Sequence, residues 1–296
     1  MKKITILLCK SLSSSYKKTT RLLSMSAVSL LLMSTTSFAA PISDLYVFGD
    51  SLSDSGALAV IAPGACPSAP YFDCRFSNGP VWAELVADEL GVTGATAYAG
   101  GTNYAIGGQR SDQVLGGQIP QFLAQNGGVA DPDALYAIWA GGNDFLQGNP
   151  DPTNAVENVL ESILGLAAFG AKDFLIFNLP IADPWAFAFN SGLANGLSTL
   201  QNDLNINQFD VFSIFLDMTL NPSDYGFTNV TEPCLTASSV CTNPDEYLLW
   251  DAVHPTAATH KFIAGAVLDS IQVSAPATLI IFSLGFAGLI RLRTKA

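Results

Sequence analysis

The chain has 296 residues, of which 49% are hydrophobic and 13% charged, and its formal net charge at pH 7 is −12. Nine of its 13 Lys and Arg lie in the first 40 residues or after residue 290. The middle therefore carries four cations against 25 Asp and Glu, a net charge of −21. Such a surface repels phosphate backbones, which excludes nucleic acid as an expected partner.

The first forty residues predict a secretory signal peptide that is not part of the fold. Six basic residues between Lys2 and Arg21 precede a mostly apolar stretch from Leu22 to Met33. Residues 37–40 then supply the small side chains that a signal peptidase requires, so this enzyme is an expected partner. An N-terminal membrane anchor is the alternative, but the apolar stretch is short for one.

Residues 41–272 predict one α/β domain. Apolar runs typical of buried strands occur at Leu45–Phe48, Thr102–Ile106, Leu135–Ala140, Phe174–Asn178 and Val211–Phe215. Helical spacing of apolar residues occurs between or after them, at Val81–Leu90, Ala155–Phe169 and Ala257–Ile271. This alternation predicts a parallel sheet with helices on both faces and the carboxyl ends of the strands along one edge. We interpret the irregular segment Asp183–Leu193 as a substrate-facing loop, with ordinary core as the alternative.

The first predicted strand runs into Gly49-Asp50-Ser51-Leu52. A serine at the carboxyl end of a parallel strand can project its hydroxyl into the crevice where open α/β sheets bind ligands. The alternative is a turn followed by a helix N-cap. Further along, Asp54 is expected to cap the next helix.

Two glycine-rich clusters follow later strands. The pair Gly107 and Gly108 allows close approach of a ligand and exposes backbone N–H groups, although a tight turn is the alternative. Asn143 comes shortly after the run Leu135–Ala140 and is placed to donate a hydrogen bond into the same crevice, with a helix cap as the alternative. Its neighbour Asp144 is expected to be a structural partner.

The fourth cluster, Asp251 to His254, precedes the last predicted helix. The spacing is close enough for the Asp251 carboxylate to hold the His254 imidazole in one tautomer. A purely structural histidine before Pro255 is the alternative. The other histidine of the chain, His260, is expected to face solvent on the last helix.

The cysteines are typical of an exported protein. Cys9 lies in the signal peptide, and the other four form two close pairs, Cys66 with Cys74 and Cys234 with Cys241. An even number of cysteines in an exported chain predicts two disulfides. Of the three possible pairings, the one that joins the members of each close pair is the simplest. A zinc site is the alternative, although the chain has only two histidines and no Cys-x-x-Cys spacing.

The four clusters, taken in order from Leu45 to Ile271, resemble the GDSL lipases and esterases, also called SGNH hydrolases. The resemblance implies a flavodoxin-like three-layer α/β/α sandwich with a parallel sheet of about five strands. It implies Ser51 as nucleophile, His254 as general base and Asp251 as its orienting acid. The implied oxyanion hole uses the Ser51 N–H, the Gly108 N–H, with Gly107 as the near alternative, and the Asn143 side chain. No cofactor or metal is implied.

The function expected from this resemblance is an exported serine ester hydrolase that forms an acyl-serine intermediate. The ester would belong to a lipid, an acylated small molecule or a polysaccharide. The region from Cys234 to Thr256 also resembles plant-type GDSL lipases and bacterial acyltransferases. An acyltransferase and a polysaccharide deacetylase are therefore alternatives that use the same site. A non-catalytic surface-matrix binding protein is the alternative from another class.

Residues 273–296 differ in composition from the domain. A small-residue and proline motif at Ser274-Ala275-Pro276 precedes an apolar stretch that ends at Ile290, and Arg291, Arg293 and Lys295 follow. This arrangement resembles the PEP-CTERM sorting signal of Gram-negative bacteria, although Ala275 replaces the usual glutamate. The resemblance implies export across the inner membrane, membrane contact by this tail before an exosortase processes it, and a cell-surface or extracellular product. A plain tail anchor is the alternative.

Overall fold

The structure is a computed structural model that describes residues 42–201 and 204–272. The expected signal peptide, residues 1–40, and the expected sorting tail, residues 273–296, lie outside the described residues and stay predictions. Across the described ranges, none of the helices has both the length and the apolar composition that a membrane span requires.

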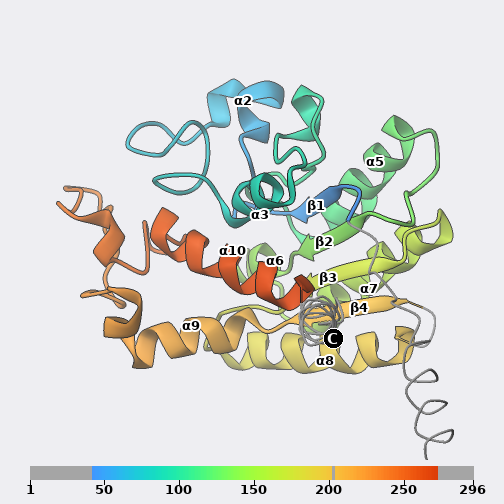
Figure 1. The fold of residues 1–296 in the computed structure, drawn as a ribbon. Coiled ribbons are helices and arrows are strands. Elements are labelled where there is room, and N and C mark those ends of the chain that lie inside the picture. Colours follow the sequence, from blue (N-terminus) through green and yellow to red (C-terminus); the bar gives the residue numbers. More distant parts are fainter. Residues whose placement is uncertain (1–41, 202–203, 273–296) are drawn as a thin grey trace, which may run out of the picture. The chain divides into compact units, whose positions relative to one another are not determined.

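A four-stranded parallel sheet forms the centre of the domain. Its strands, in spatial order, are β1 (Leu45–Gly49), β2 (Leu135–Trp139), β3 (Asp173–Phe177) and β4 (Asn205–Phe209). All three neighbouring pairs are parallel, with Leu45 opposite Leu135 and Leu135 opposite Asp173. Every residue of β2 is buried, as expected for a central strand covered on both faces. The carboxyl ends of the strands therefore share one edge, toward which the arrowheads point in Figure 1.

Helices cover both faces of this sheet, which gives the expected three-layer arrangement. Side chains alternate between faces along β2, so Tyr136 and Trp139 point to opposite sides. On one side, the Trp82 ring of α3 (Trp82–Leu90) packs near Trp139. On the other side, the Phe122 ring of α5 (Ile119–Gln125) makes an edge contact with Tyr136. The α/β sandwich is therefore confirmed.

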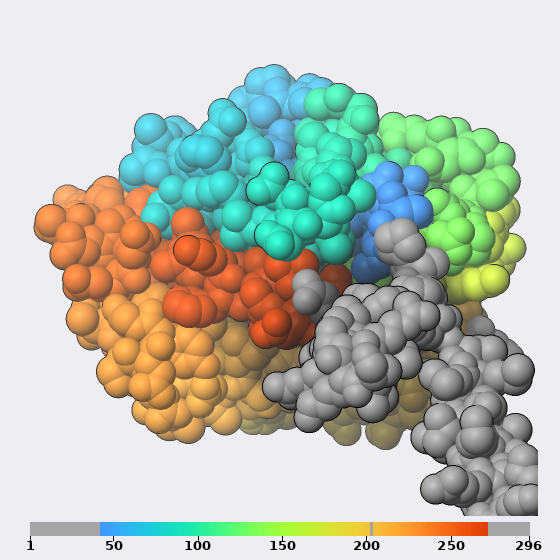
Figure 2. Space-filling view, viewed as in Figure 1, coloured from blue at the N-terminus to red at the C-terminus, as the bar shows by residue number. Residues whose placement is uncertain are grey.

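The longer helices pack in pairs. Helix α10 (Ala257–Gln272) contacts α3, and α7 (Pro152–Ala168) contacts α8 (Pro184–Leu200). Figure 2 shows α10 in red between the cyan region around α3 and the orange α9 (Val211–Leu220). The shorter helical elements are α2 (Ala57–Ile61), η1 (Pro63–Ala65), η2 (Ala97–Ala99), α4 (Ser111–Gln113), the π-helical turn η3 (Val114–Gln118), α6 (Gly142–Leu146), η4 (Pro222–Tyr225) and η5 (Pro244–Glu246).

The sheet has four strands where the sequence predicted about five. The expected strand Thr102–Ile106 lies beside β1 but makes only an isolated bridge to it, between Val47 and Asn103. Tyr104 N donates to Val47 O at 2.7 Å and Ile106 N donates to Gly49 O at 3.2 Å, so this extended segment still covers the free edge of β1.

Two other predictions for single segments were wrong. The expected strand Val211–Phe215 is the first half of α9, because Asp210 caps a helix there by accepting hydrogen bonds from Ser213. The expected loop Asp183–Leu193 belongs mostly to α8. Here Asp183 is the N-cap and Pro184 occupies the first helical position, a combination that favours a helix start.

Candidate active site

The end of β1 turns sharply and presents Ser51. Gly49 has a φ of 152°, and a Cβ at this position would lie 2.2 Å from the Trp139 carbonyl oxygen, so only glycine fits beside β2. The Gln118 side chain bonds both backbone groups of Gly49, at 2.9 Å to its N–H and 2.7 Å to its oxygen. Ser53 N then donates to Asp50 O at 3.0 Å and closes the turn. Ser51 is left at its tip with 8% of its surface exposed.

Three of the predicted site residues form one hydrogen-bonded line. Ser51 Oγ lies 2.8 Å from His254 Nε2, and His254 Nδ1 lies 2.7 Å from Asp251 Oδ2. A carboxylate only accepts hydrogen bonds, so Nδ1 carries the proton of the neutral imidazole. Nε2 is then free to accept the proton of the Ser51 hydroxyl. The arrangement joins a hydroxyl, a base and an acid in the order that nucleophilic catalysis requires.

The spacing of Asp251 and His254 is explained by the turn that they share. Asp251 Oδ1 accepts hydrogen bonds from the N–H groups of Val253 and His254 at 2.9 and 2.8 Å, which leaves Oδ2 facing the imidazole. Burial acts to raise the pKa of the Asp251 carboxyl. Hydrogen bonds from His254 and Tyr71 outweigh burial and hold this pKa at about 2. Asp251 is therefore ionised at neutral pH, and its negative charge lies next to the imidazole.

Gly108 and Asn143 line the same cavity as Ser51 and His254. Asn143 belongs to α6, where Gly141 is the N-cap, so the asparagine does not cap this helix. Its Nδ2 donates to Gln109 O at 3.1 Å, which holds the amide at the cavity wall. The N–H of Gly107 donates to Asp54 Oδ2 at 2.8 Å and is therefore already engaged.

Asp144 has the structural role that the sequence predicted, whereas Asp54 bonds the start of α2 but is not its N-cap, which is Gly56. Asp54 Oδ1 accepts from Gly56 N at 2.8 Å and from Ala57 N at 2.6 Å at the start of α2. Asp144 accepts from both the N–H and the hydroxyl of Ser111, each at 2.8 Å. Asp54 also bonds the N–H of Gly107, the residue before Gly108 of the cavity wall.

The expectation that His260 faces solvent is wrong. Its side chain is 1% exposed, and Nδ1 accepts a hydrogen bond from Trp82 N at 3.3 Å. Because α10 packs on α3, the face of α10 that carries His260 is an internal one. Burial lowers the pKa of His260 to about 3, and nearby His254 adds to the effect, so His260 is neutral at pH 7.

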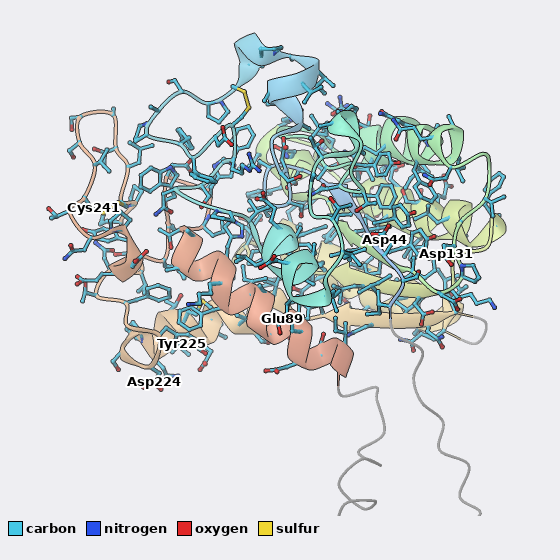
Figure 3. All side chains as sticks on the ribbon, turned by 45° about the horizontal axis from the view of Figure 1, so that its top comes forward. Asp44, Glu89, Asp131, Asp224, Tyr225 and Cys241 are labelled. Atoms are coloured by element: carbon cyan, nitrogen blue, oxygen red, sulfur yellow. A yellow bond between two sulfur atoms is a disulfide. The ribbon has the colours of Figure 1, made fainter. Side chains whose placement is uncertain are left out.

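The four cysteines form the two local disulfides, Cys66–Cys74 and Cys234–Cys241. Figure 3 labels Cys241, and the yellow bond near α2 is the other disulfide. The alternative of a zinc site on these cysteines is wrong, since their sulfur atoms are bonded to one another. Within residues 42–201 and 204–272, no three His, Cys, Asp or Glu side chains gather as metal ligands would.

A cavity of about 610 Å³ opens beside Ser51 and His254. Its wall is mainly apolar and includes the large side chains of Phe76, Phe145, Leu179, Phe212, Phe215 and Leu248. The Phe76 ring also lies 5.1 Å from the His254 ring, so one side of the imidazole is covered by an aromatic surface. A cavity of this size and polarity fits an apolar small-molecule group.

Three residues beside the predicted ones were not recognised from the sequence as parts of the site. Burial raises the pKa of Asp50 from 3.8 to about 6, against the opposing hydrogen bond from Leu52 N. Phe76 lines the cavity, and Tyr71 bonds Asp251 from 180 residues away. Phe76 and Tyr71 lie in an irregular segment, so no periodicity or spacing could have assigned them to the site.

Comparison with known proteins places most of the described chain in one protein family. The family model described as GDSL-like Lipase/Acylhydrolase matches residues 45–267. The Thermolabile hemolysin of Vibrio parahaemolyticus is 26% identical over 276 residues, which cover 77% of this chain and 64% of the hemolysin. The Phosphatidylcholine-sterol acyltransferase of Aeromonas hydrophila is 30% identical over 226 residues, which cover 67% of each protein.

The chain thus spans about two thirds of the length of these two curated relatives. Among solved structures, the psychrotrophic esterase EstA from Pseudoalteromonas sp. has 17% sequence identity to this chain and a TM-score of 0.45. That match covers 77% of this chain and 96% of EstA.

Proposed function

The chain belongs to the GDSL-like lipase/acylhydrolase family, and on that premise we propose that it is an exported serine hydrolase of carboxylic esters that works through an acyl-serine intermediate. The observation that carries the proposal is the hydrogen-bonded line from Ser51 through His254 to Asp251, at the wall of an apolar cavity. The same line weighs against a non-catalytic binding protein, which has no need of it.

In the first step, Ser51 Oγ attacks the ester carbonyl carbon while its proton moves to His254 Nε2. A serine hydroxyl is a weak nucleophile until a base takes this proton. The imidazolium that forms keeps its Nδ1 hydrogen bond to Asp251, whose negative charge stabilises it. The low pKa of Asp251, about 2, supports a role in which the carboxylate stays ionised throughout.

The carbonyl oxygen becomes negative in the tetrahedral intermediate and needs donors that are already in place. We assign this role to the Ser51 N–H, the Gly108 N–H and Asn143 Nδ2. The choice of Gly108 over Gly107 is supported by the hydrogen bond that commits the Gly107 N–H to Asp54. Asn143 is supported by its position on the same cavity wall as Ser51.

Collapse of the intermediate breaks the bond to the alcohol, which leaves with the proton from His254. The acyl group stays on Ser51 as an ester. Water then gives a proton to His254 Nε2 and adds to this ester, and the returning proton regenerates the Ser51 hydroxyl as the carboxylic acid leaves. No step requires a group that the chain's own residues and water do not supply.

The apolar cavity supports an acyl chain as the group held beside Ser51, and hence a lipid or another acyl ester as substrate. It weighs against a polysaccharide deacetylase, whose acetyl group would leave most of this surface unused. An acyltransferase stays as the second candidate, since the relative from Aeromonas hydrophila bears that name and the same acyl-serine can react with an alcohol. Addition of an alcohol acceptor separates the two, because a transferase yields a new ester in place of free acid.

Export is supported by the two disulfides, which persist in oxidising compartments. We propose that the product reaches the cell surface or the medium of a Gram-negative bacterium. Signal peptidase would remove residues 1–40, and an exosortase-type enzyme would process the membrane-contacting tail. Fractionation of cells and medium, with and without residues 273–296, tests this part of the proposal.

The catalytic part is tested with the full chain and p-nitrophenyl esters from acetate to palmitate. Wild type is expected to hydrolyse them, and Ser51→Ala to lose activity by a factor on the order of 10⁴ to 10⁶. The control is Ser198→Ala, because this exposed hydroxyl on α8 bonds only Asn195 O in the described structure. Equal activity of wild type and Ser51→Ala would refute the proposal.

A further inference from the structure

A second segment, far from the catalytic turn in sequence, bonds its carboxylate. The Tyr71 hydroxyl donates to Asp251 Oδ2 at 2.7 Å, the same oxygen that accepts the Nδ1 proton of His254. Oδ1 is bonded by two N–H groups of the turn itself, those of Val253 and His254. Within the described structure, Tyr71 is thus the donor that reaches Asp251 from outside its own turn.

The position of Tyr71 is fixed by its surroundings. It lies inside the loop closed by the Cys66–Cys74 disulfide, and its N–H donates to Ser68 O at 3.2 Å. Its ring makes an edge contact with Trp250, with the ring centres 6.1 Å apart. Burial and the bond to Asp251 raise the pKa of Tyr71, so its hydroxyl keeps its proton as a donor at neutral pH.

The chain that follows Tyr71 continues to contact the catalytic turn. Phe76 covers the His254 ring, and Ser77 Oγ donates to Pro255 O at 2.9 Å. Asn78 Oδ1 accepts from Ala257 N, the first residue of α10, at 2.8 Å. Residues 66–78, which we call the bracing segment, therefore contact the turn before, at and after His254.

The bracing segment is itself anchored to helix α3, which covers one face of the sheet. Arg75 pairs with Glu84 of α3, with Nη2 and Oε1 2.6 Å apart and both side chains mostly buried. Glu84 also accepts from Val81 N at 3.0 Å, at the start of the same helix. The disulfide closes one part of the segment, and this ion pair ties the other part to α3.

We propose that Tyr71 is a positioning residue of the esterase: its hydroxyl fixes the Asp251 carboxylate so that Oδ2 faces His254, and the disulfide-closed bracing segment holds it there. The inference rests on the proposed function, since it gives Tyr71 a role in the activity of that site. Tyr71 touches neither Ser51 nor the reacting atoms, so it acts through Asp251 alone.

Loss of this hydroxyl has a consequence that loss of packing does not. With one donor fewer, Oδ2 directs more of its negative charge at His254, which alters the pH dependence of the activity. The other titratable groups that act on this pair are Asp50, whose carboxylate lies near His254, and the neutral His260. Both are unchanged when Tyr71 is replaced, so the altered pH dependence reports the Tyr71 bond.

The test compares Tyr71→Phe with wild type in the full chain, on one p-nitrophenyl ester, between pH 5 and 9. Rates are expressed per active site, counted by titration of Ser51 with a phosphonate ester, so unfolded molecules do not contribute. We expect kcat to fall about tenfold, the size of one hydrogen bond to a charged group. We expect KM to stay within twofold and the acid limb of kcat/KM to move to higher pH.

Tyr225→Phe is the matched control, since Tyr225 also donates to a carboxylate, that of Asp217. Figure 3 labels it beside Asp224 on η4, and neither Tyr225 nor Asp217 lines the cavity. This variant is expected to keep the wild-type kcat and pH profile. A second variant, Cys66→Ser with Cys74→Ser, releases the bracing segment and is expected to lower kcat in the same way. The same double replacement at Cys234 and Cys241, which removes the other disulfide, is expected to leave kcat unchanged.

The outcomes are separable. If wild type is active and Tyr71→Phe keeps both its kcat and its acid limb, the inference is overturned and the esterase proposal stands. The inference is also overturned if Tyr225→Phe loses as much kcat as Tyr71→Phe. An inactive wild type, or an active Ser51→Ala, contradicts the proposed function instead.

Discussion

Ser51 and His254 are 203 residues apart in the chain, and Ser51 Oγ lies 2.8 Å from His254 Nε2. One follows the first strand and the other precedes the last helix, so the contact forms only when both ends of the domain are folded together. Esterase activity is therefore expected to report the integrity of the whole domain and not of a local part.

Asn143→Ala is expected to keep the fold and to lower kcat by about 10² to 10³, because it removes one of the proposed oxyanion donors. The KM for a p-nitrophenyl ester should change little, since the donor acts mainly on the transition state. The control is Asn126→Ala at the C-cap of α5, where the amide bonds Phe122 O and the Tyr104 hydroxyl and does not line the cavity. Unchanged turnover in Asn143→Ala would remove this residue from the oxyanion hole.

Leu216→Trp is expected to shift the acyl preference toward shorter esters. Leu216 lines the cavity from α9 and is 46% exposed, so the larger ring can enter the cavity without breaking the core. The matched control is Leu164→Trp on α7, where the side chain is 49% exposed and outside the cavity wall. The measurement is kcat/KM across the ester series, and parallel profiles for the two variants would contradict the assignment of the cavity.

Asp50→Asn is expected to raise the free energy of unfolding at neutral pH. Because burial raises the pKa of Asp50 from 3.8 to about 6, the folded state binds this proton more tightly than the unfolded state. The stabilisation from this group is therefore present below pH 4 and lost as pH rises through 6. At pH 7 the ionised carboxylate costs up to about 3 kcal/mol.

Urea unfolding at pH 4.5 and 7.5 measures this effect. The advantage of Asp50→Asn over wild type should be larger at pH 7.5 and shrink at pH 4.5. The exposed Asp224 supplies a control, and Asp224→Asn should stay close to wild type at both values. An advantage of the same size at both pH values would contradict the shifted pKa.

His260→Asn is expected to reduce the loss of stability that the protein undergoes when the pH is lowered. Burial lowers the pKa of His260 from 6.5 to about 3, so the unfolded state binds this proton more tightly. The stabilisation is present above pH 6.5 and is lost as pH falls toward 3, by about 2–3 kcal/mol at pH 4.5. The asparagine of His260→Asn keeps an acceptor for Trp82 N. This variant should therefore lose less stability than wild type between pH 6.5 and 4.5. An equal loss in both proteins would refute this.

The sequence predicted the well-buried parts of the fold better than its edge. Strands β1, β2 and β3 are short apolar runs bounded by turn residues, and their predicted bounds are within one residue of those observed. Strand β4 was missed because its sequence, Asn-Ile-Asn-Gln-Phe, is polar and half exposed. A strand was instead predicted in the apolar run that follows it, Val211–Phe215, which is helical. Apolar runs do not by themselves distinguish a strand from a buried helix.

The residues of the candidate site likewise fall into those that the local sequence predicted and those that it did not. Ser51, Gly108, Asn143 and His254 follow or precede predictable elements, and the fold brings all four to one cavity. The side of α10 that His260 occupies depends on the packing of α10 against α3, which its local sequence does not contain. Tyr71 depends on a loop path set by a disulfide and an ion pair, and no local pattern encodes that path.

The two edges of the sheet bear on self-association. Residues Thr102–Ile106 cover the edge of β1, so a second chain cannot add a strand there without displacing them. The other edge, β4, is five residues long and carries the amide side chains of Asn205, Asn207 and Gln208. Short polar edges are poor templates for strand addition between molecules. Neither edge of the described sheet therefore favours growth of an intermolecular sheet, and the folded domain is protected against this route of aggregation.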